Sequence, residues 1–429
     1  MVLFDWRKLA ELTGFVLASL GLILLGLVQG FQSYSVTLDL FFLVFDVLLI
    51  EAVASSFFFT GFLLISSILF FWRLRSSKSD MSLDREDSVV CVVPTYKDSE
   101  VLDISVDSLL DSNYENFEII IVCEEDDKKG IEKAKELSKK EKVSYLVNTG
   151  YPGSKAGAIN FAAEETDSDV IAIFDADQKV SKNFLSEALK LLKDNEVVQG
   201  RHLPRANGLI ESLAYYESLI FSYVVRQPLN LLTGFRLIGS RATLIKRSVF
   251  ENLEGYSDNT LTEDYDFAHK CYRQDIKTEE LILEPVTEEA AHSLLDWWCQ
   301  RKRWMTGYFE VFAKTLRLAF KNYRGYRSFL SLLICSGSIL GSILMLTLVS
   351  KFVILFLVGA EGIYLIPLAS ILIISLIGRF HDFGSGNLDN VGWSWILTPL
   401  IFPLFSLITI KAFFEFLLDK EKSWYRVEK

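Results

Sequence analysis

The sequence predicts an α/β domain with a mostly parallel sheet, placed between blocks of membrane-spanning helices. Residues 1–75 and 328–418 are strongly apolar, whereas residues 76–327 hold most of the charge of this 429-residue chain. Within the middle block, short runs of β-forming apolar residues alternate with helical stretches. That alternation is typical of parallel strands covered by helices on both faces. The middle block is a fair size for one such domain.

The N-terminal block contains two candidate membrane spans. Residues 12–28 form an apolar run, and residues 52–72 form a second run that stops at Arg73. Each is long enough to cross a bilayer once its flanks are counted. A signal peptide is the alternative for the first run, and we reject it because no small-x-small cleavage site follows. Residues 31–50 contain no Lys or Arg, so the positive-inside rule predicts that the middle block is cytoplasmic.

The C-terminal block contains three apolar segments, near residues 328–358, 363–378 and 394–418. Three crossings would place the C-terminus outside, whereas the basic residues of the tail favour the inside. Pro399 and Pro403 favour a kinked or re-entrant last segment. The number of C-terminal crossings and the side of the C-terminus therefore stay open.

Four strands are expected in the first half of the middle block, with helices between them. The strands fall at residues 89–93, 117–122, 144–147 and 170–174, and helices are expected at 128–141 and 155–165. Ligands of such sheets bind at the carboxyl ends of the strands. Three of these ends carry polar clusters, at residues 95–98, 124–127 and 175–177. A binding site is expected where these clusters meet.

Asp175 and Asp177 directly follow the fourth predicted strand. Side chains at positions i and i+2 of an extended segment point to the same face. Two carboxylates placed in this way repel each other, and a hard divalent cation with substrate phosphates is their natural partner. A solvated turn after a strand is the alternative for this pair taken alone.

A glycine-bearing turn at residues 150–155 ends with Lys155 at the start of a predicted helix. Backbone N–H groups and one cation at such a place suit a phosphate. The spacing is not that of a Walker loop. A plain loop before a helix is the alternative.

Thr262, Glu263 and Asp264 precede a helical stretch at residues 265–273. A helix N-cap followed by acids that the helix dipole favours is the structural alternative to a role in chemistry. Further along, Gln300, Arg303 and Trp304 share one face of a predicted helix.

A guanidinium on that helix face can grip a diphosphate, and an indole can stack on a sugar ring. A membrane-surface helix is the alternative for residues 297–327, and the two interpretations are compatible. The five cysteines show no paired spacing, so neither a disulfide framework nor a zinc site is expected. The net charge of −11 argues against a nucleic-acid partner.

Taken in order, these segments resemble the motifs of the membrane-integrated family 2 glycosyltransferases, the group of cellulose, chitin, hyaluronan and poly-N-acetylglucosamine synthases. The residues that carry the resemblance are Pro94 to Tyr96, Lys155 to Asn160, Asp175 to Asp177, Thr262 to Asp264 and Gln300 to Trp304. The resemblance implies a Rossmann-like GT-A fold and a nucleotide-diphosphate sugar donor, UDP-linked in the first instance. It also implies inverting transfer to a growing polysaccharide, with processive export as an extension.

The resemblance further implies which residues bind the donor: Thr95, Tyr96, Asp98, Glu124, Lys155 and Asp175. The first three would frame the nucleobase. Glu124 departs from the family pattern, because members often have an aspartate after the second strand, and it would contact the base with a longer arm.

The remaining roles follow from the same resemblance. Asp177 would hold Mg²⁺ or Mn²⁺ against the diphosphate, and Asp264 would be the general base. The acceptor and the diphosphate would be lined by Gln300, Arg303 and Trp304. The partners implied are a nucleotide sugar, a polysaccharide or lipid acceptor, and membrane lipids.

The expected organisation has four parts. An N-terminal transmembrane hairpin and linker spans 1–80, the GT-A domain 81–295, amphipathic interfacial helices 296–327, and C-terminal transmembrane segments with a short tail 328–429. The chain is expected to be a multi-pass cell-membrane protein with a cytoplasmic catalytic domain. The alternative function is transfer of a single sugar to a membrane lipid of the glycolipid or polyprenyl-phosphate type. A non-catalytic scaffold is least favoured, because every catalytic motif position is filled.

Overall fold

The computed structural model describes residues 40–76, 87–321 and 325–418. The predicted span at 12–28 and the basic tail at 419–429 lie outside the described residues. The chain divides into two compact units. The helical unit comprises Met1–Arg73, Ala206–Phe235 and Gly337–Phe414, and the sheet unit comprises Leu74–Arg205, Arg236–Ser336 and Glu415–Lys429.

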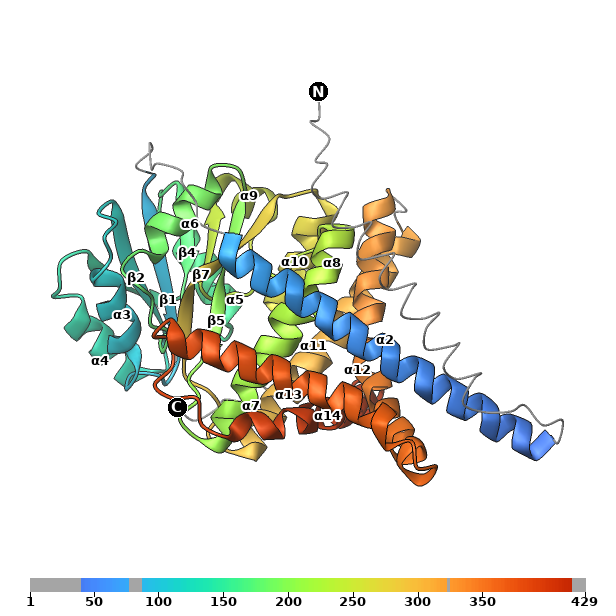
Figure 1. Cartoon of the computed structure of the whole chain (residues 1–429). Coiled ribbons are helices and arrows are strands. Elements are labelled where there is room, and N and C mark those ends of the chain that lie inside the picture. The colour runs from blue at the N-terminus through green and yellow to red at the C-terminus, as the bar shows by residue number, and fades with distance from the viewer. Residues whose placement is uncertain (1–39, 77–86, 322–324, 419–429) are drawn as a thin grey trace. The chain divides into compact units, whose positions relative to one another are not determined.

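The sheet unit is built on a seven-stranded sheet with the strand order β3-β2-β1-β4-β6-β5-β7 (Figure 1). Strands β1 to β4 run parallel to one another, and so do β5 and β7, whereas β6 is antiparallel to both of its neighbours. The predicted mostly parallel α/β sheet is therefore confirmed. The strands are β1 (Val89–Thr95), β2 (Phe117–Glu124), β3 (Val143–Asn148), β4 (Val170–Ile173), β5 (Val197–Pro204), β6 (Thr243–Lys246) and β7 (Thr278–Glu288).

The central strands are apolar throughout because helices cover the sheet. In β1 every residue except Pro94 is buried, and all four residues of β4 are buried. Strands buried on both faces lose the polar alternation of a half-exposed strand. The helices of this unit are α3 (Leu102–Leu110), α4 (Lys128–Leu137), α5 (Lys155–Glu164), α6 (Phe184–Leu192), α9 (Arg247–Asn252), α10 (Glu263–Arg273) and α11 (Leu294–Lys321).

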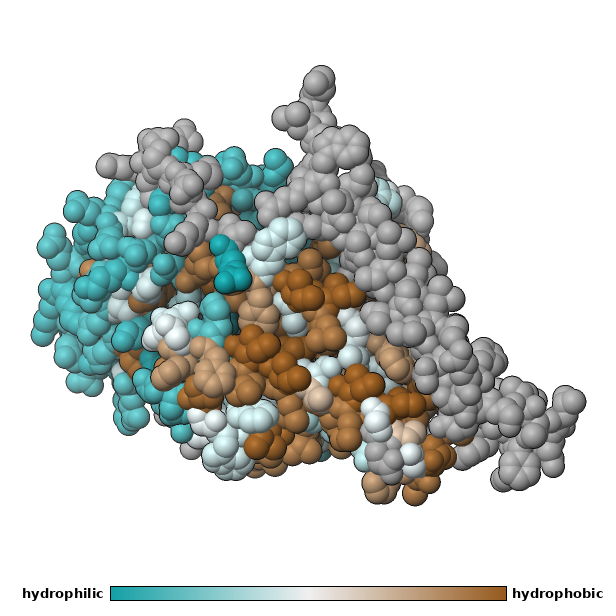
Figure 2. Space-filling model, viewed as in Figure 1, coloured by the Kyte–Doolittle hydropathy of each residue, from teal (hydrophilic) through white to brown (hydrophobic). Residues whose placement is uncertain are grey.

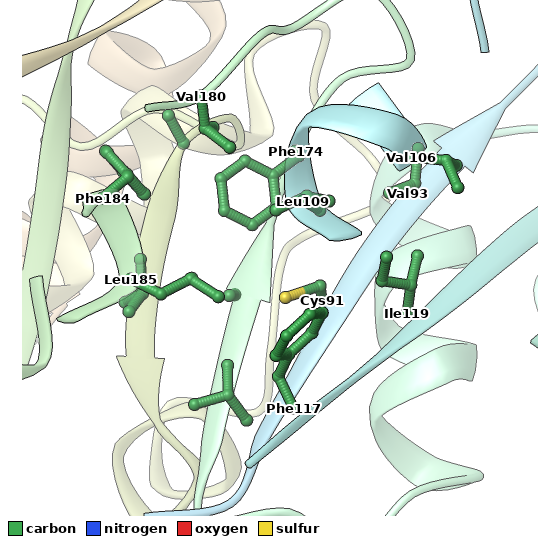
Figure 3. Close-up of a cluster of buried hydrophobic side chains, with 14 of the residues drawn as sticks. Cys91, Val93, Val106, Leu109, Phe117, Ile119, Phe174, Val180, Phe184 and Leu185 are labelled. Carbon is green, nitrogen blue, oxygen red and sulfur yellow. The ribbon is translucent and has the colours of Figure 1, made fainter. Parts of the chain in front are cut away.

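A buried apolar cluster supports the strand end that carries Asp175 (Figure 3). Phe174, directly before that aspartate, is fully buried and packs edge-on against Phe184 of α6, with ring centroids 5.8 Å apart. Gly200 of β5 leaves room for this contact, since a Cβ there would come within 2.8 Å of the Phe184 ring. Dense packing of this kind fixes the direction in which the chain leaves β4.

The helical unit contains most of the apolar chain, and Figure 2 shows mainly hydrophobic side chains on its described helices. Residues 206–235, between β5 and β6, belong to this unit and form α7 (Leu209–Glu217), the π-helix η1 (Ser218–Val224) and α8 (Arg226–Thr233). The long helices are α2 (Leu40–Ser76), α12 (Tyr326–Leu357), which begins in the sheet unit, and α13 (Glu361–Gly384). The 3₁₀ segment η2 (Ser394–Leu400) continues into α14 (Ile401–Leu417).

Four helical segments in the described residues are long and apolar enough to cross a membrane: Leu49–Arg75, Tyr326–Leu357, Gly362–Gly384 and Ser394–Leu417. They include the second predicted N-terminal span and the three predicted C-terminal segments. The first of them precedes the sheet and the other three follow it. The predicted class, an α/β domain inserted between apolar helices, therefore agrees with the structure.

Candidate active site

The carboxyl ends of β1, β2 and β4 lie at one edge of the sheet. Thr95 pairs with Cys123, and Val92 pairs with Ile173, both in parallel register. The polar clusters at 95–98, 124–127 and 175–177 therefore emerge side by side, as the sequence pattern predicts. This edge is where α/β sheets bind their ligands.

The end of β1 forms a tight turn beside α4. Lys97 has a left-handed backbone, with φ 59°, and its N–H donates to Asp127 Oδ2 at 2.5 Å. The other oxygen of Asp127 accepts from the Gly130 N–H at 3.0 Å and so caps α4. Tyr96 is held as well, because its hydroxyl donates to Asp126 Oδ2 at 3.0 Å.

Thr95 and Asp98 flank this turn. Thr95 is 4% exposed, and its hydroxyl has no hydrogen-bond partner in the described parts of the chain. A buried hydroxyl of this kind costs stability unless a ligand or water satisfies it. Asp98 lies in the turn before α3, where its carbonyl accepts from the Val101 N–H at 3.2 Å.

Glu124 at the end of β2 holds the glycine-bearing turn. One of its carboxylate oxygens accepts from Asn148 Nδ2 and the other from the Gly153 N–H, both at 2.8 Å. Gly153 has φ 93°, a conformation that favours glycine. Both oxygens of Glu124 are thus engaged by the protein itself, so the carboxylate shapes the turn that leads to Lys155.

Two further contacts fix where α5 begins. The Ser154 hydroxyl accepts from the Gly157 N–H at 2.9 Å and caps the helix. A Cβ at position 157 would come within 2.1 Å of the Tyr151 carbonyl oxygen, so the close approach requires glycine. The helix therefore starts at Lys155, and the Lys155 ammonium forms an ion pair with Asp175.

The loop after β4 is tied to the end of β7. The Asp175 N–H donates to Gln178 Oε1 at 3.0 Å, and Gln178 Nε2 donates to Glu288 Oε2 at 3.0 Å. Lys179 and Thr287 exchange two backbone hydrogen bonds, at 2.8 and 3.1 Å. The end of β7 thus holds the Asp175 to Asp177 segment in place.

Asp177, the predicted metal ligand, is 3% exposed, and its Oδ2 accepts from the Glu289 N–H at 3.1 Å. Across residues 40–76, 87–321 and 325–418 no group of three or more His, Cys, Asp or Glu side chains converges to hold an ion. Mg²⁺-type ions are commonly held by one or two carboxylates together with substrate phosphates. One carboxylate beside the Lys155–Asp175 pair fits that shared mode of binding.

Asp264 lies in the first turn of α10, where its Oδ1 accepts from the Tyr265 N–H at 2.7 Å. Burial and the neighbouring Glu263 carboxylate raise the pKa of Asp264 to about 6, although Arg241 and Lys155 act to lower it. A carboxylate with this pKa is ionised at neutral pH and remains basic enough to accept a proton.

Helix α11 brings Arg303 to the same place. Its Nη1 donates to the Leu261 carbonyl at 3.3 Å. Burial lowers the pKa of Arg303, and the carboxylates of Glu263, Asp264 and Asp175 oppose that shift. Arg303 therefore lies within electrostatic range of both the predicted base and the predicted donor-binding aspartate.

Gly307, one turn further along α11, allows the helix to approach the predicted base. A Cβ there would come within 2.4 Å of Thr262 Oγ1. Trp304 is flanked by cations, since the guanidinium carbons of Arg301 and Arg241 lie 4.6 and 5.8 Å from its ring centroid. Gln300 contacts the neighbouring Arg301.

The part of the chain that holds β1 to β6 matches a known family. Residues 90–253 match Glycosyl transferase family 2. They form a family 2 glycosyl transferase domain. The matched residues include Thr95, Glu124, Lys155, Asp175 and Asp177, whereas the segment of Asp264 and helix α11 follow the match.

The glycosyl transferase domain has named relatives. The beta-monoglucosyldiacylglycerol synthase of Trichormus variabilis is 25% identical over 178 residues, which are 41% of this chain and 38% of that protein. The cellulose synthase catalytic subunit (UDP-forming) of Xanthomonas axonopodis pv. citri is 29% identical over 178 residues, 39% of this chain and 24% of that protein. The chain thus matches well under half the length of these relatives.

A solved structure agrees in fold. The mannosyltransferase PcManGT from Pyrobaculum calidifontis, in complex with GDP-Man and Mn²⁺, is 17% identical, with a TM-score of 0.55 over 88% of this chain and 100% of that chain. The GT-A fold expected from the sequence is confirmed.

Three residues of this site were missed by the sequence reasoning: Gln178, Arg241 and Glu288. Arg241 precedes β6 and Glu288 ends β7, two strands that the apolar-run criterion did not identify. The four residues of β6 form a run too short to stand out, and β7 mixes six glutamate and threonine residues with its apolar ones. The Glu288–Glu289 pair, shortly before α11, was the available signal.

Proposed function

We propose that the protein transfers a sugar, with inversion, from a nucleotide-diphosphate sugar to a growing polysaccharide at the membrane. The placement of Asp264 carries the proposal. A carboxylate with a pKa of about 6 stands at the start of α10, within electrostatic range of Lys155 and of Arg303. These three residues come from three different helices, and the fold brings them to the carboxyl edge of a family 2 domain.

The donor is proposed to bind along the ends of β1, β2 and β4. Thr95, Tyr96 and Asp98 frame the nucleobase, and the buried Thr95 hydroxyl supports a polar ligand there. Lys155 and Asp175 contact the nucleotide sugar. The predicted contact of Glu124 with the base stays a prediction, and its two hydrogen bonds support a role in shaping the turn.

The proposed reaction is a single displacement. The acceptor hydroxyl oxygen attacks the anomeric carbon, its proton passes to the Asp264 carboxylate, and the nucleoside diphosphate leaves with the bonding electrons. The guanidinium of Arg303 stabilises the charge that develops on the diphosphate. Asp177, with diphosphate oxygens, would hold Mg²⁺ or Mn²⁺, which would supply further neutralisation of that charge.

The acceptor is proposed to bind along α11. Trp304 offers a ring face for a sugar, and Gln300 and Arg303 offer hydrogen-bond donors on neighbouring turns. A second candidate acceptor is a membrane lipid that takes a single sugar. The likeness to a protein named beta-monoglucosyldiacylglycerol synthase favours this second candidate.

A donor screen followed by product partition tests the proposal. Membranes that contain the full chain are incubated with radiolabelled UDP-glucose, UDP-N-acetylglucosamine, UDP-glucuronate or GDP-mannose, and nucleoside diphosphate release is measured. A polymeric product that organic solvent does not extract, whether soluble or precipitated, supports the first acceptor. Label that extracts into organic solvent as one sugar on lipid overturns the polymer and supports the second.

A further inference from the structure

The loop at residues 239–243, here named the Arg241 loop, is held by side chains of two strands. Gln199 Nε2 of β5 donates to the Arg241 carbonyl at 2.9 Å, and its Oε1 accepts from the Gly239 N–H at 2.5 Å. The Thr243 hydroxyl donates to the same Arg241 carbonyl at 3.0 Å.

Ala242 adds strain to this loop. Its φ of 47° lies in the left-handed region, which a non-glycine residue adopts only when its surroundings enforce it. The hydrogen bonds from Gln199 and Thr243 supply that enforcement. Strained backbone of this kind gathers at functional sites, where it aims a side chain.

A buried carboxylate anchors the Arg241 side chain. Glu288 is 5% exposed, and its Oε1 lies 2.9 Å from Arg241 Nη1. Gln178 donates to the other oxygen at 3.0 Å, and His202 Nδ1 lies 3.4 Å from it. Burial alone would raise the pKa of Glu288, but Arg241 and His202 hold it well below its ordinary value, so the anchor is ionised.

The anchored guanidinium faces the proposed base and acceptor residues. It lies 5.8 Å from the Trp304 ring centroid and acts electrostatically on Asp264 and Arg303. The preceding residue of the loop, Ser240, donates a hydrogen bond to Glu263 Oε1 at 2.6 Å, which fastens the loop to the start of α10. The Arg241 side chain is 29% exposed, so the site retains access to it.

We propose that Arg241, anchored by Glu288, is a positioning residue for the transfer: it supports the negative charge on Asp264 and holds the ring of Trp304 for the acceptor. The inference rests on the proposed function. Arg241 acts through these two residues and takes no proton itself, since its guanidinium stays protonated.

The charges around Asp264 determine whether replacement of Arg241 raises or lowers the pKa of the Asp264 carboxyl. They come from Glu263 on the same helix, Lys155 at the start of α5, Arg303 on α11, and Arg241. The buried phenol of Tyr256, whose own pKa is raised, also interacts with this carboxylate. Arg241 lowers the pKa of Asp264, so its removal raises that pKa and moves the acidic limb of the activity profile to higher pH.

The test measures kcat/KM of the full chain in detergent from about pH 5 to pH 8.5. We expect Arg241→Gln to lose about fivefold more activity at pH 6 than at pH 8, relative to wild type, because without the Arg241 charge more of the Asp264 carboxyl is protonated at pH 6. Arg241→Lys keeps the charge and should restore the wild-type acidic limb. Because each comparison is made within one variant, it does not depend on how much protein folds.

Arg236→Gln is the matched control. It removes the same type of charge from another ion pair of the sheet unit, Arg236 with Glu279 at 3.0 Å, and should leave the limb unchanged. The inference would be overturned if the acidic limb of the kcat/KM profile of Arg241→Gln coincided with that of the wild type, or if that of Arg241→Lys were shifted from it. An Arg236→Gln limb that moves as far as that of Arg241→Gln would do the same.

A double-variant cycle tests the anchor. Glu288→Gln removes the charge that faces Arg241 but leaves an amide oxygen that can still accept from Gln178, which holds the loop of Asp175. If the charge of Glu288 acts through Arg241, adding Glu288→Gln to Arg241→Gln should lower kcat/KM by less than about twofold further. Losses that multiply would show that this charge acts independently of Arg241 and would overturn the anchoring. Asp264→Asn separates the two proposals. If it keeps turnover, the proposed base is wrong, whereas a dead Asp264→Asn with an unshifted Arg241→Gln removes this inference alone.

Discussion

Asp264 illustrates how the surroundings of a single residue set its pKa. The first turn of a helix stabilises a negative charge, whereas burial and Glu263 destabilise it, and the pKa settles at about 6. We expect kcat/KM of the wild type to fall as the pH drops below about 6, as this carboxylate takes up a proton. A pH profile measured with saturating metal checks this.

Replacement of Asp264 with Asn should lower kcat by about 10²- to 10⁴-fold, the usual contribution of a general base, and should leave nucleotide binding largely intact. Turnover and equilibrium nucleotide binding are measured on the same preparation. Asp258→Asn is the control, because it removes the same charge from an exposed residue six positions earlier. Unchanged turnover in Asp264→Asn would refute the assignment of the base.

Asp177 makes a second prediction at this scale. Asp177→Ala should abolish the dependence of donor binding on Mn²⁺, because the proposed shared site loses its protein carboxylate. Titration of a nucleoside diphosphate with and without the metal measures this. Asp194→Ala, at an exposed position, should retain the dependence. Equal donor affinity of the wild type with and without metal would exclude the role.

At the scale of elements, the sequence predicted β1 to β4, whose apolar runs stand out, and missed β5, β6 and β7, which are short or mix polar residues with apolar ones. The run before Asp175 identified β4, and the run before Thr95 identified β1. Strand β7 mixes acids with apolar residues, and β6 is short, so Glu288 and Arg241 were not found. Their pairing joins residues 47 positions apart and depends on sheet order, which local patterns do not encode.

The close approach of α11 to Thr262 can be tested by replacing Gly307 of that helix. A helix is normally more stable with alanine than with glycine at an interior position, by about 1 kcal/mol. Gly307→Ala should nevertheless lower both Tm and kcat, because its Cβ would come within 2.4 Å of Thr262 Oγ1. Gly341→Ala in α12 meets nothing within 4 Å and is the control. Thr262→Ala should restore part of the loss in the double variant, and a Gly307→Ala enzyme with wild-type kcat would contradict the packing argument.

At the scale of the whole molecule, the described residues contain four apolar helices together with a family 2 glycosyl transferase domain. The thiols offer a way to test the predicted cytoplasmic side. Cys91, Cys123, Cys271 and Cys335 are buried, whereas Cys299 on α11 is partly exposed. Burial raises the pKa of Cys123 to about 12 and that of Cys91 further still, which suppresses their reaction.

We therefore expect a membrane-impermeant maleimide to label the native protein at Cys299 in inverted vesicles and to leave it unlabelled in intact cells. Labelling is read by mass shift, and Cys299→Ser should abolish it. Labelling of intact cells would contradict the predicted orientation. A second native label that persists in Cys299→Ser would contradict the burial of the other thiols.

The length of the segment between β7 and α11 affects how the helix packs. Strand β7 ends at Glu288 and α11 begins at Leu294, so residues 289–293 join the sheet to the helix, and their number must suit the rotational phase at which Gly307 packs on Thr262. At 3.6 residues per turn, one inserted residue turns the helix by about 100°. Arg303 and Trp304 would then leave the face of α11 that is turned toward Asp264, while the core of the sheet would stay unchanged. We therefore expect this segment to tolerate changes of residue type but not a change of length.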